Sequence, residues 1–275
     1  MGGRNTVSGR KPPPTPLPPP MPKPQPAPKP QPAPKPKPKP KPAPTTTTAM
    51  RLTDMNDTQL ASFVDNAMKA KLPAHFHDDI TQRMILAANW NDKPEVVTST
   101  QAETAAKKRG AIVLYRTNNT KGARMTAQKF SDMFRTSNTF STGGKRGQQY
   151  GGGLYFSSDF HGSKAYGYGS QSNTIGAVLN KNAKVVAMSD LQGRMGRDWL
   201  NKHPAAAKKL GFTTNRYGIV QKKHGMGSYT ALAMAMGYNV VGSKVGGGET
   251  YYTVLNRAAL TTSTKDYWNS PNGMK

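Results

Sequence analysis

The sequence predicts an α+β domain preceded by a long proline-rich arm. Two observations favour this fold class: apolar residues recur at helical spacing early in the folded region, and short apolar runs interrupted by helices follow them. A third observation marks the arm, since 19 of the 23 prolines lie before residue 45. We therefore expect four parts. A disordered Pro/Lys-rich arm or spacer covers residues 1–50, a helical lead-in 51–110, a core 111–265 and a tail 266–275.

The arm is expected to be extended. Proline takes every second position from Pro22 to Pro44, which forbids a helix and favours a polyproline ribbon. At about 3.1 Å per residue, residues 12–44 would reach on the order of 100 Å. Such a segment serves as a spacer, as an attachment arm, or as a ligand for proline-reading modules.

Charge and composition narrow the classes of partner. The chain has a formal charge of +25 and no cysteine, which excludes disulfides, thiolate metal sites and a cysteine nucleophile. It has no run of about 18 apolar residues and no apolar core of a signal peptide, so we expect a soluble protein without a membrane span. The electrostatic field of this positive charge attracts nucleic acid, acidic membrane surfaces or acidic protein faces. We expect the arm to contact DNA or another polyanion.

The helical lead-in begins at residues 56–71, where Leu60, Phe63, Val64 and Met68 recur at helical spacing behind an Asn-Asp start. Similar patterns predict further helices at 78–88, 98–108, 126–134 and 228–236.

The period changes at residues 111–116 (AIVLYR), a short apolar run with β-branched residues that predicts a buried strand. Other runs of this kind predict strands at 153–157, 174–179, 183–188, 216–220 and 238–241, and at the start of 251–260.

Several common catalytic signatures are missing from the sequence. It contains neither a GxxxxGK[ST] phosphate loop nor a GxGxxG turn between a strand and a helix. His75 and His77 have no third metal ligand nearby, and His161 and His224 have no serine and acid partners in sequence. We therefore expect neither a metal site nor a hydrolase triad.

The chain has only three glutamates, and one of them stands apart. Glu95 and Glu103 fall in or beside the predicted N-terminal helices, which is typical of a solvated face. Glu249 instead follows VGGG and precedes an apolar strand, where glycine lets the backbone approach a neighbour closely. It is either an exposed carboxylate at a strand end or a group that faces a cleft.

Residues 151–167 (GGGLYFSSDFHGSKAYG) resemble the nicotinamide-binding stretch of the ADP-ribosyltransferases, in the branch of poly-ADP-ribose polymerase and diphtheria toxin. There a Gly-x-Gly turn leads to a Tyr-Phe strand, a serine follows the tyrosine by eight residues, and a second tyrosine follows it by eleven. Tyr155, Ser163 and Tyr166 meet this spacing. The resemblance implies that the two tyrosines sandwich the nicotinamide ring of NAD and that Ser163 bonds its carboxamide.

The same resemblance assigns binding roles to the neighbours of these residues. It implies that the backbone of Gly152 and Gly153 approaches the carboxamide and that Phe156 belongs to the NAD-binding stretch. A flat ring needs aromatic partners and a narrow slot, and glycine keeps a slot open. A simpler explanation is a glycine turn into a strand, followed by a helix that Asp159 caps.

The end of AIVLYR resembles the Leu-Tyr-Arg opening of the arginine-type branch, which is common among toxins and tailed-phage enzymes. This implies that Arg116 binds the phosphates or adjoining ribose of NAD, a task suited to a planar, always-charged fork. Residues 235–242 and 251–260 resemble the closing strands of phage-encoded members. The implied fold is a split β-sandwich of short strands around an NAD cleft, over about residues 95–262.

Two features depart from the family pattern. The arginine-type branch carries Ser-Thr-Ser, whereas this chain has Ser-Thr at 141–142 and Ser-Ser at 157–158. The alignment also places Tyr251 where the catalytic glutamate often stands, with Glu249 two residues earlier. Positions i and i+2 share one face of a strand, so Glu249 is expected to point into the cleft.

The resemblance implies an NAD-dependent mono-ADP-ribosyltransferase that needs no metal and modifies a protein acceptor. Glu249, Arg116 and Tyr155 are its expected catalytic residues, and NAD is the co-substrate. Phage-encoded members and effectors act in the host cytoplasm or travel with the virion, so both places are expected. The alternatives are an inactive protein of the same fold that serves a virion and grips DNA or a partner through its basic arm, and a plain nucleic-acid-binding protein.

Overall fold

The computed structural model describes residues 51–73, 78–117, 126–137, 152–167, 174–222 and 228–265, without the side chains of Ala127 and residues 165–167. The chain divides into two units, residues 1–45 and 46–275, and all described residues belong to the second. The predictions for the arm, for the tail, for residues 141–142 and for His75, His77 and His224 fall outside the described residues.

The expected N-terminal helices are present, and each begins at a capping side chain. A short 3-10 helix, η1 (Leu52–Asp54), precedes α1 (Asp57–Lys69), α2 (Ile80–Ala87) and α3 (Ser99–Ala106). Asn56 and Thr98 form capping boxes with the glutamines three residues later, and Asp79 accepts from the backbone of Thr81. These caps satisfy backbone N–H groups at the first turn of each helix.

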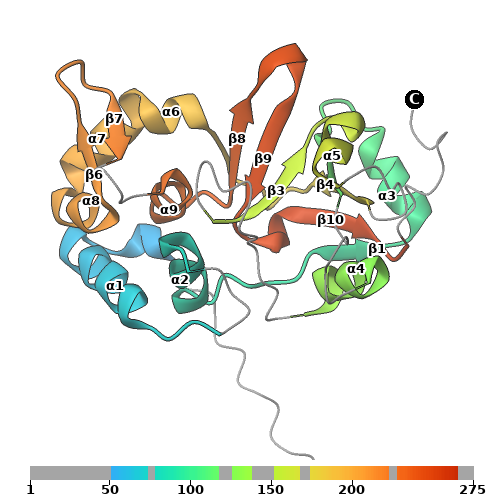
Figure 1. Ribbon diagram of the computed structural model, residues 1–275, viewed down its shortest axis with the longest axis horizontal. Helices are drawn as coiled ribbons and strands as arrows, with labels where there is room; N and C mark the ends of the chain where they lie inside the picture. The colour runs from blue at the N-terminus through green and yellow to red at the C-terminus, as the bar shows by residue number, and fades with distance from the viewer. Residues whose placement is uncertain are drawn as a thin grey trace, which may run out of the picture. The chain divides into compact units, whose positions relative to one another are not determined.

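The core contains one mixed sheet of eight strands in the order β1-β10-β4-β2-β3-β9-β8-β5 (Figure 1). Pairs β1–β10 and β5–β8 are parallel and the others are antiparallel. The α+β class is therefore confirmed. The strands are β1 (Glu95–Val97), β2 (Val113–Thr117), β3 (Leu154–Ser157), β4 (Thr174–Leu179), β5 (Val185–Ala187), β8 (Val240–Lys244), β9 (Thr250–Val254) and β10 (Leu260–Ser263).

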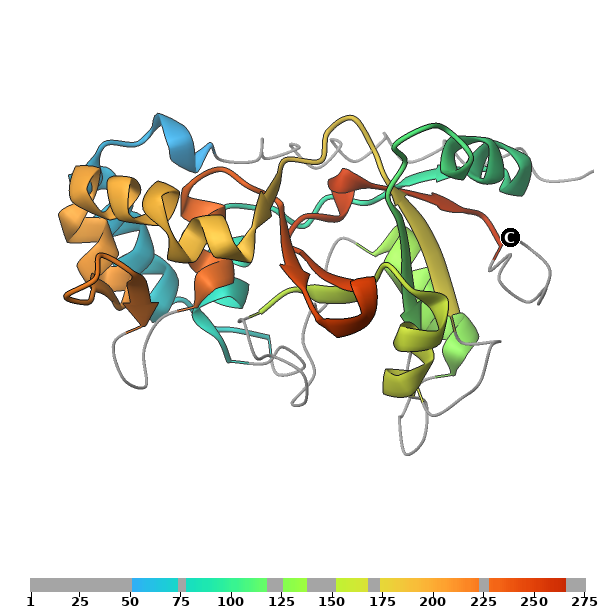
Figure 2. The ribbon, with the colours of Figure 1, turned by 90° about the horizontal axis from the view of Figure 1, so that it is seen from above.

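The sheet has a weak joint between β2 and β3. Strand β2 pairs with β4 along its whole length, from Val113 to Thr117, whereas it pairs with β3 only through Tyr115 and Ser157. Beyond that pair the two strands separate, and Figure 2 shows β3 and β9 diverging from β2 and β4. The joint divides the sheet into two halves of four strands.

Side chains alternate between the two faces of the sheet, and a helix contacts each face near the joint. Helix α4 (Ala127–Thr136) packs Phe134 against Phe156, within a cluster that includes buried Leu114 and Leu154. On the opposite face, α5 (Phe160–Gly167) sets Phe160 edge-to-face against Tyr115.

Arg257 fixes the end of α4. It opens a 3-10 helix, η4 (Arg257–Ala259), and is 2% exposed. Its guanidinium donates to the carbonyls of Met133, Phe134 and Ser137, and the last of these bonds is 2.5 Å long. Burial lowers the pKa of Arg257 to about 10, which the nearby charge of Asp92 opposes. A cation at this position also complements the negative end of the helix dipole.

A second helical layer lies beside the sheet. It comprises α6 (Met188–Gln192), α7 (Arg194–Lys202), α8 (Pro204–Leu210), α9 (Tyr229–Ala235) and a separate hairpin of β6 (Phe212–Thr214) and β7 (Val220–Lys222). These elements share a core with α1 and α2. Asp57 accepts from the backbone of Ala205 and Ala206, so one carboxylate of α1 caps α8.

The strand predicted at 216–220 is wrong. Strand β7 begins only at Val220, and the preceding residues form the hairpin turn. Asn215 holds this turn, because its side chain accepts from the backbone of Tyr217 and Ile219, and Gly218 adopts a φ of 73°. The sequence analysis also left α6–α8, β1, β6 and β10 unassigned. Among the described residues, no helix has the length and apolarity needed to cross a bilayer.

Candidate active site

Glu249 and Ser157 meet beside the joint of the sheet. Ser157 ends β3, and its hydroxyl donates to Oε1 of Glu249 at 2.5 Å. The backbone of Asp159 donates to the same hydroxyl oxygen at 2.8 Å, so the serine proton is directed at the carboxylate. Glu249 is therefore held in a defined place and is half-buried.

A glycine on α5 makes this position possible. A Cβ built at Gly162 would lie 2.0 Å from Oε1 of Glu249, which is far inside van der Waals contact, and its three nearest atoms all belong to that carboxylate. Any larger residue at 162 would displace Glu249 from Ser157. Asp159 caps α5 by accepting from the backbone of Gly162 at 2.6 Å, as the simpler explanation of this stretch expects.

Ser158 fixes the start of β9 against the end of β3. Its backbone donates to the carbonyl of Thr250 at 2.9 Å, and its hydroxyl accepts from the backbone of Thr250 at 2.9 Å. The backbone of Val245 donates to the carbonyl of Glu249 at 3.0 Å, which closes the glycine turn before the strand. These bonds explain why Glu249 faces Ser157 rather than open solvent.

Arg116 spans the joint from the other side. Its Nη1 donates to the carbonyl of Tyr155 at 2.8 Å, where the pairing of β2 and β3 has ended, and its guanidinium lies 5.7 Å from the ring centre of Phe130. Burial lowers the pKa of Arg116 to about 10. Its Nε is buried without a hydrogen-bond partner, and the ion pairs formed within the described residues involve other cations.

Ser163 belongs to a row of three buried hydroxyls. Thr117 Oγ1 lies 2.7 Å from Ser163 Oγ and 2.7 Å from Thr174 Oγ1. Thr117 has one proton, so it donates to at most one of its two neighbours. Whichever direction these hydrogen bonds take, the Ser163 hydroxyl can still either donate or accept one more. A carboxamide has both an N–H donor and a carbonyl acceptor, so it suits either case.

The two tyrosines of the predicted sandwich are described to different extents. Tyr155 lies on β3 two residues before Ser157, so both share the strand face opposite Phe134 and α4, and Tyr155 is half-buried. Tyr166 lies in the last turn of α5, three residues after Ser163, but its side chain is outside the described residues. The pairing of the two rings stays a prediction.

Three of the expected NAD-binding residues make contacts within the chain, and for the two glycines the NAD-binding role stays a prediction. Phe156 is 2% exposed and packs in the core on the face opposite Tyr155, so its assignment to NAD binding is corrected. The backbone of Gly152 donates to Asp79, and a Cβ there would lie 2.5 Å from that carboxylate. A Cβ at Gly153, whose φ is 145°, would lie 2.4 Å from Thr253. Contacts within the chain therefore account for both glycines.

Aromatic rings line the face of β2 under α5. The ring centres of Tyr115 and Phe160 are 5.5 Å apart, and the ammonium of Lys164 lies 4.6 Å from the ring centre of Phe160. Burial raises the pKa of Tyr115, and the negative charge of Asp159 adds to this effect. The phenol is therefore neutral at physiological pH.

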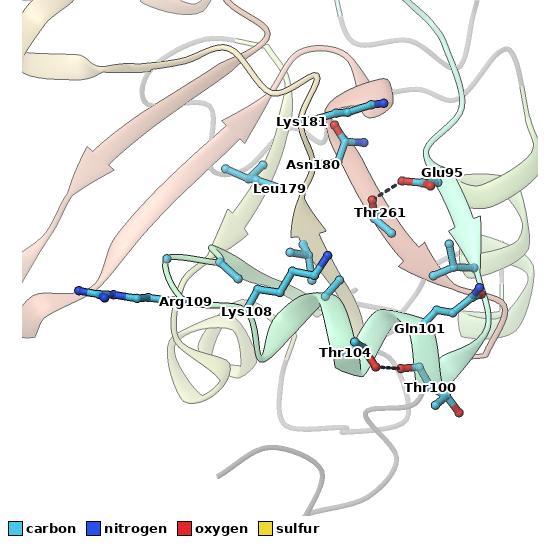
Figure 3. Close-up of a pocket in the computed structure, with 15 residues that line it drawn as sticks. Glu95, Thr100, Gln101, Thr104, Lys108, Arg109, Leu179, Asn180, Lys181 and Thr261 are labelled. Atoms are coloured by element: carbon cyan, nitrogen blue, oxygen red, sulfur yellow. Dashed lines mark hydrogen bonds between the residues drawn. The ribbon is translucent and has the colours of Figure 1, made fainter.

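A separate groove of about 750 Å³ lies between α3 and strands β4 and β10 (Figure 3). Thr261 donates to Glu95 at 2.6 Å on one side of it. Lys108, which also lines it, follows the C-terminal end of α3, where a cation stabilises the helix dipole. The groove shares no residue with the Glu249–Ser157 pair. Within the described ranges, no three His, Cys, Asp or Glu side chains gather as metal ligands.

Comparisons with models of known families, with curated proteins and with solved structures give no match for this chain. The function therefore has to be inferred from the sequence pattern and the geometry of the site. It brings Glu249 to Ser157 and α5, and Arg116 to the backbone of Tyr155. The sequence analysis did not assign roles to Ser157 or Gly162. A glycine inside a helix, five residues after a strand-end serine, was the available signal.

Proposed function

We propose that the chain is an NAD-dependent mono-ADP-ribosyltransferase that transfers ADP-ribose to a protein acceptor and releases nicotinamide. The observation that carries the proposal is the Glu249 carboxylate, which Ser157 and Gly162 hold beside the line where the sheet divides. A carboxylate fixed by a serine suits a reaction in which positive charge develops on a sugar. Without the spacing of Tyr155, Ser163 and Tyr166, the pair would not specify NAD.

Glu249 acts on the ribose next to nicotinamide. As the bond between C1′ and the nicotinamide nitrogen breaks, the ring leaves with the electron pair, and positive charge spreads over C1′ and the ring oxygen. The carboxylate stabilises this charge through a hydrogen bond to a ribose hydroxyl. A nucleophile of the acceptor then bonds to C1′ from the open face and loses its proton.

Ser157 and Ser163 have distinct tasks in this scheme. Ser157 keeps one carboxylate oxygen of Glu249 bonded, which leaves the other oxygen for the ribose. Ser163 offers its remaining donor or acceptor to the nicotinamide carboxamide, and Tyr155 offers its ring face. Holding the substrate in one orientation lowers the entropic part of the barrier.

Arg116 fits a role beside the dinucleotide phosphates. It is a guanidinium with lowered pKa and a buried, unpartnered Nε, so a nearby anion would offset its desolvation. In sequence, residues 118–125 follow β2 and residues 138–151 precede β3. Together they contain four Lys or Arg and no Asp or Glu. Their positive charge favours an anionic ligand such as a pyrophosphate.

The experiment compares wild type with Glu249→Gln. The amide keeps the size of the side chain but cannot stabilise a cation, so NAD hydrolysis and transfer of labelled ADP-ribose should fall by about two orders of magnitude or more. NAD binding, measured by calorimetry, should change little. Glu103→Gln makes the same chemical change on α3 and should leave turnover unaltered. Equal turnover in wild type and Glu249→Gln would refute the proposed role.

A catalytically inactive virion or structural protein of similar architecture is the second candidate. The observation in its favour is that Ser163 is only 3% exposed and bonds to Thr117, while Arg116 bonds to a backbone carbonyl. Both groups already have partners within the chain. NAD binding without hydrolysis or transfer by the wild-type protein would favour this candidate.

A further inference from the structure

Residues 212–222 form a β-hairpin outside the main sheet. Phe212 pairs with Lys222 and Thr214 with Val220, and the hairpin lies beside α7 and α8 (Figure 1). Phe212 and Val220 are buried in the helical core, so the base of the hairpin is anchored. Its turn, residues 215–219, projects from that base.

The turn has a defined conformation. Asn215 bonds four times within it: its side chain accepts from the backbone of Tyr217 at 2.9 Å and of Ile219 at 3.0 Å, its N–H donates to Ile219, and its carbonyl accepts from Gly218. Gly218 supplies the left-handed φ of 73° that the turn requires. The side chains at the tip are therefore presented on a fixed backbone.

The tip exposes an aromatic ring beside a guanidinium group. Tyr217 is 69% exposed, which is unusual for so large a side chain, and Ile219 beside it is 48% exposed. The guanidinium carbon of Arg216 lies 4.7 Å from the ring centre of Tyr217. Arg197 of α7 reaches the same turn, because a Cβ at Gly218 would lie 2.7 Å from its Nη1.

The surroundings of the tip are strongly basic. Residues 194–222 contain seven lysines and arginines and one acid, Asp198. Asp198 is shared by Arg194 at 3.5 Å and Arg197 at 3.9 Å, so it neutralises neither fully. Within the described part of the chain, Arg216 and Lys222 form no ion pair with a carboxylate.

We propose that the hairpin tip and α7 bind single-stranded nucleic acid. An unpaired base stacks on the ring of Tyr217, and the adjoining phosphates lie against Arg216 and Arg197. The excess of cations selects a polyanion, and the exposed ring selects a strand whose bases offer a free face, which a duplex does not. This surface is distinct from the Glu249–Ser157 pair, and the proposal does not depend on ADP-ribosyl transfer.

The test uses the full-length protein and a fluorescent oligothymidylate of about 20 nucleotides, with anisotropy measured over a range of salt concentrations. Tyr217→Ala should weaken binding about 5- to 150-fold, since it removes one stacked base. Tyr217→Phe keeps the ring and should bind like wild type. Arg216→Gln should reduce the slope of log K against log salt by about 0.7, as expected for one lost contact to single-strand phosphate.

Controls separate this surface from the general basic field. Lys107→Gln removes one exposed charge after α3 and should leave affinity and salt slope close to wild type. All these positions are exposed, so the variants should fold, which circular dichroism checks. The proposal is overturned if Tyr217→Ala binds the oligonucleotide as wild type does, if Arg216→Gln and Lys107→Gln behave alike, or if Tyr217→Ala weakens binding to a blunt duplex equally.

Discussion

Replacing Gly162 by alanine tests the geometry of the candidate active site without assuming its chemistry. The new Cβ would lie 2.0 Å from Oε1 of Glu249, so the carboxylate has to leave the Ser157 hydroxyl. The substitution has a second, opposite effect. Gly162 lies within α5, where alanine is a better helix former by about 0.8–1.0 kcal/mol.

These two effects set the expected magnitude. A hydrogen bond to a charged group contributes about 1.5–3 kcal/mol, and we take the lower end because the Ser157–Glu249 pair is only part-buried. Gly162→Ala should then lower the free energy of unfolding by about 0.5–0.7 kcal/mol. In a Glu249→Ala background there is no carboxylate to displace, so the same substitution should instead raise the free energy of unfolding by about 0.8–1.0 kcal/mol.

The assay is a double-mutant cycle by urea denaturation of wild type, the two single variants and the double variant. The expected coupling between positions 162 and 249 is about 1.5 kcal/mol, and the sign of the alanine effect reverses between backgrounds. An equal effect of Gly162→Ala in both backgrounds would show that Glu249 does not lie over α5. If the carboxylate is also catalytic, Gly162→Ala should reduce NAD turnover as Glu249→Gln does.

Two further predictions concern stability. Arg257→Met should lower the free energy of unfolding by about 2–5 kcal/mol, because the carbonyls of Phe134 and Ser137 lose a buried donor, whereas Arg109→Met at an exposed position should change it by less than about 0.5 kcal/mol. Burial and the charge of Lys202 lower the pKa of His203 in the folded state, so the unfolded chain binds more protons as pH falls through about 6.5. The urea concentration at the unfolding midpoint should therefore decrease when the pH is lowered from 7.5 to 5.5, and it should decrease less in His203→Gln. Identical pH profiles of wild type and His203→Gln would contradict the lowered pKa of His203.

Local signals predicted those elements whose pattern is complete within one segment. Helices α1 and α2 have both a capping residue and an apolar stripe, α3 has a capping box, and strands β2 and β4 are apolar runs. Their predicted positions were confirmed within a few residues. Residues 188–210 were not assigned because α6, α7 and α8 have no side-chain cap of their own, and Asp57, far away in sequence, caps α8. The hairpin turn was taken for a strand because Ile219 and Val220 are β-branched, although Asn215 and Gly218 set the turn.

In the candidate site, too, the sequence pointed to single residues but not to the contacts between distant segments. The family resemblance singled out Arg116, Tyr155 and Ser163, which lie on strands and a helix around the joint of the sheet, and Glu249, which directly precedes β9. It did not reveal that Phe156 points into the core, although strand alternation from Tyr155 implies opposite faces. The partnership of Ser157 with Glu249 depends on how β9 returns beside β3, and such a long-range register is not encoded by either segment alone.

The single residue pair between β2 and β3 has a mechanical consequence. Four strands on each side keep their ladders intact if the two halves rotate about this line, because the motion breaks the pairing of Tyr115 with Ser157 and little else in the main chain. Arg116 then acts as a latch, since its bond to Tyr155 bridges the line. The main-chain pairing of the sheet is thereby weakest where Ser157 and Glu249 meet, and there the two halves are held together by the apolar cluster of Leu114, Leu154 and Phe156 that spans the joint.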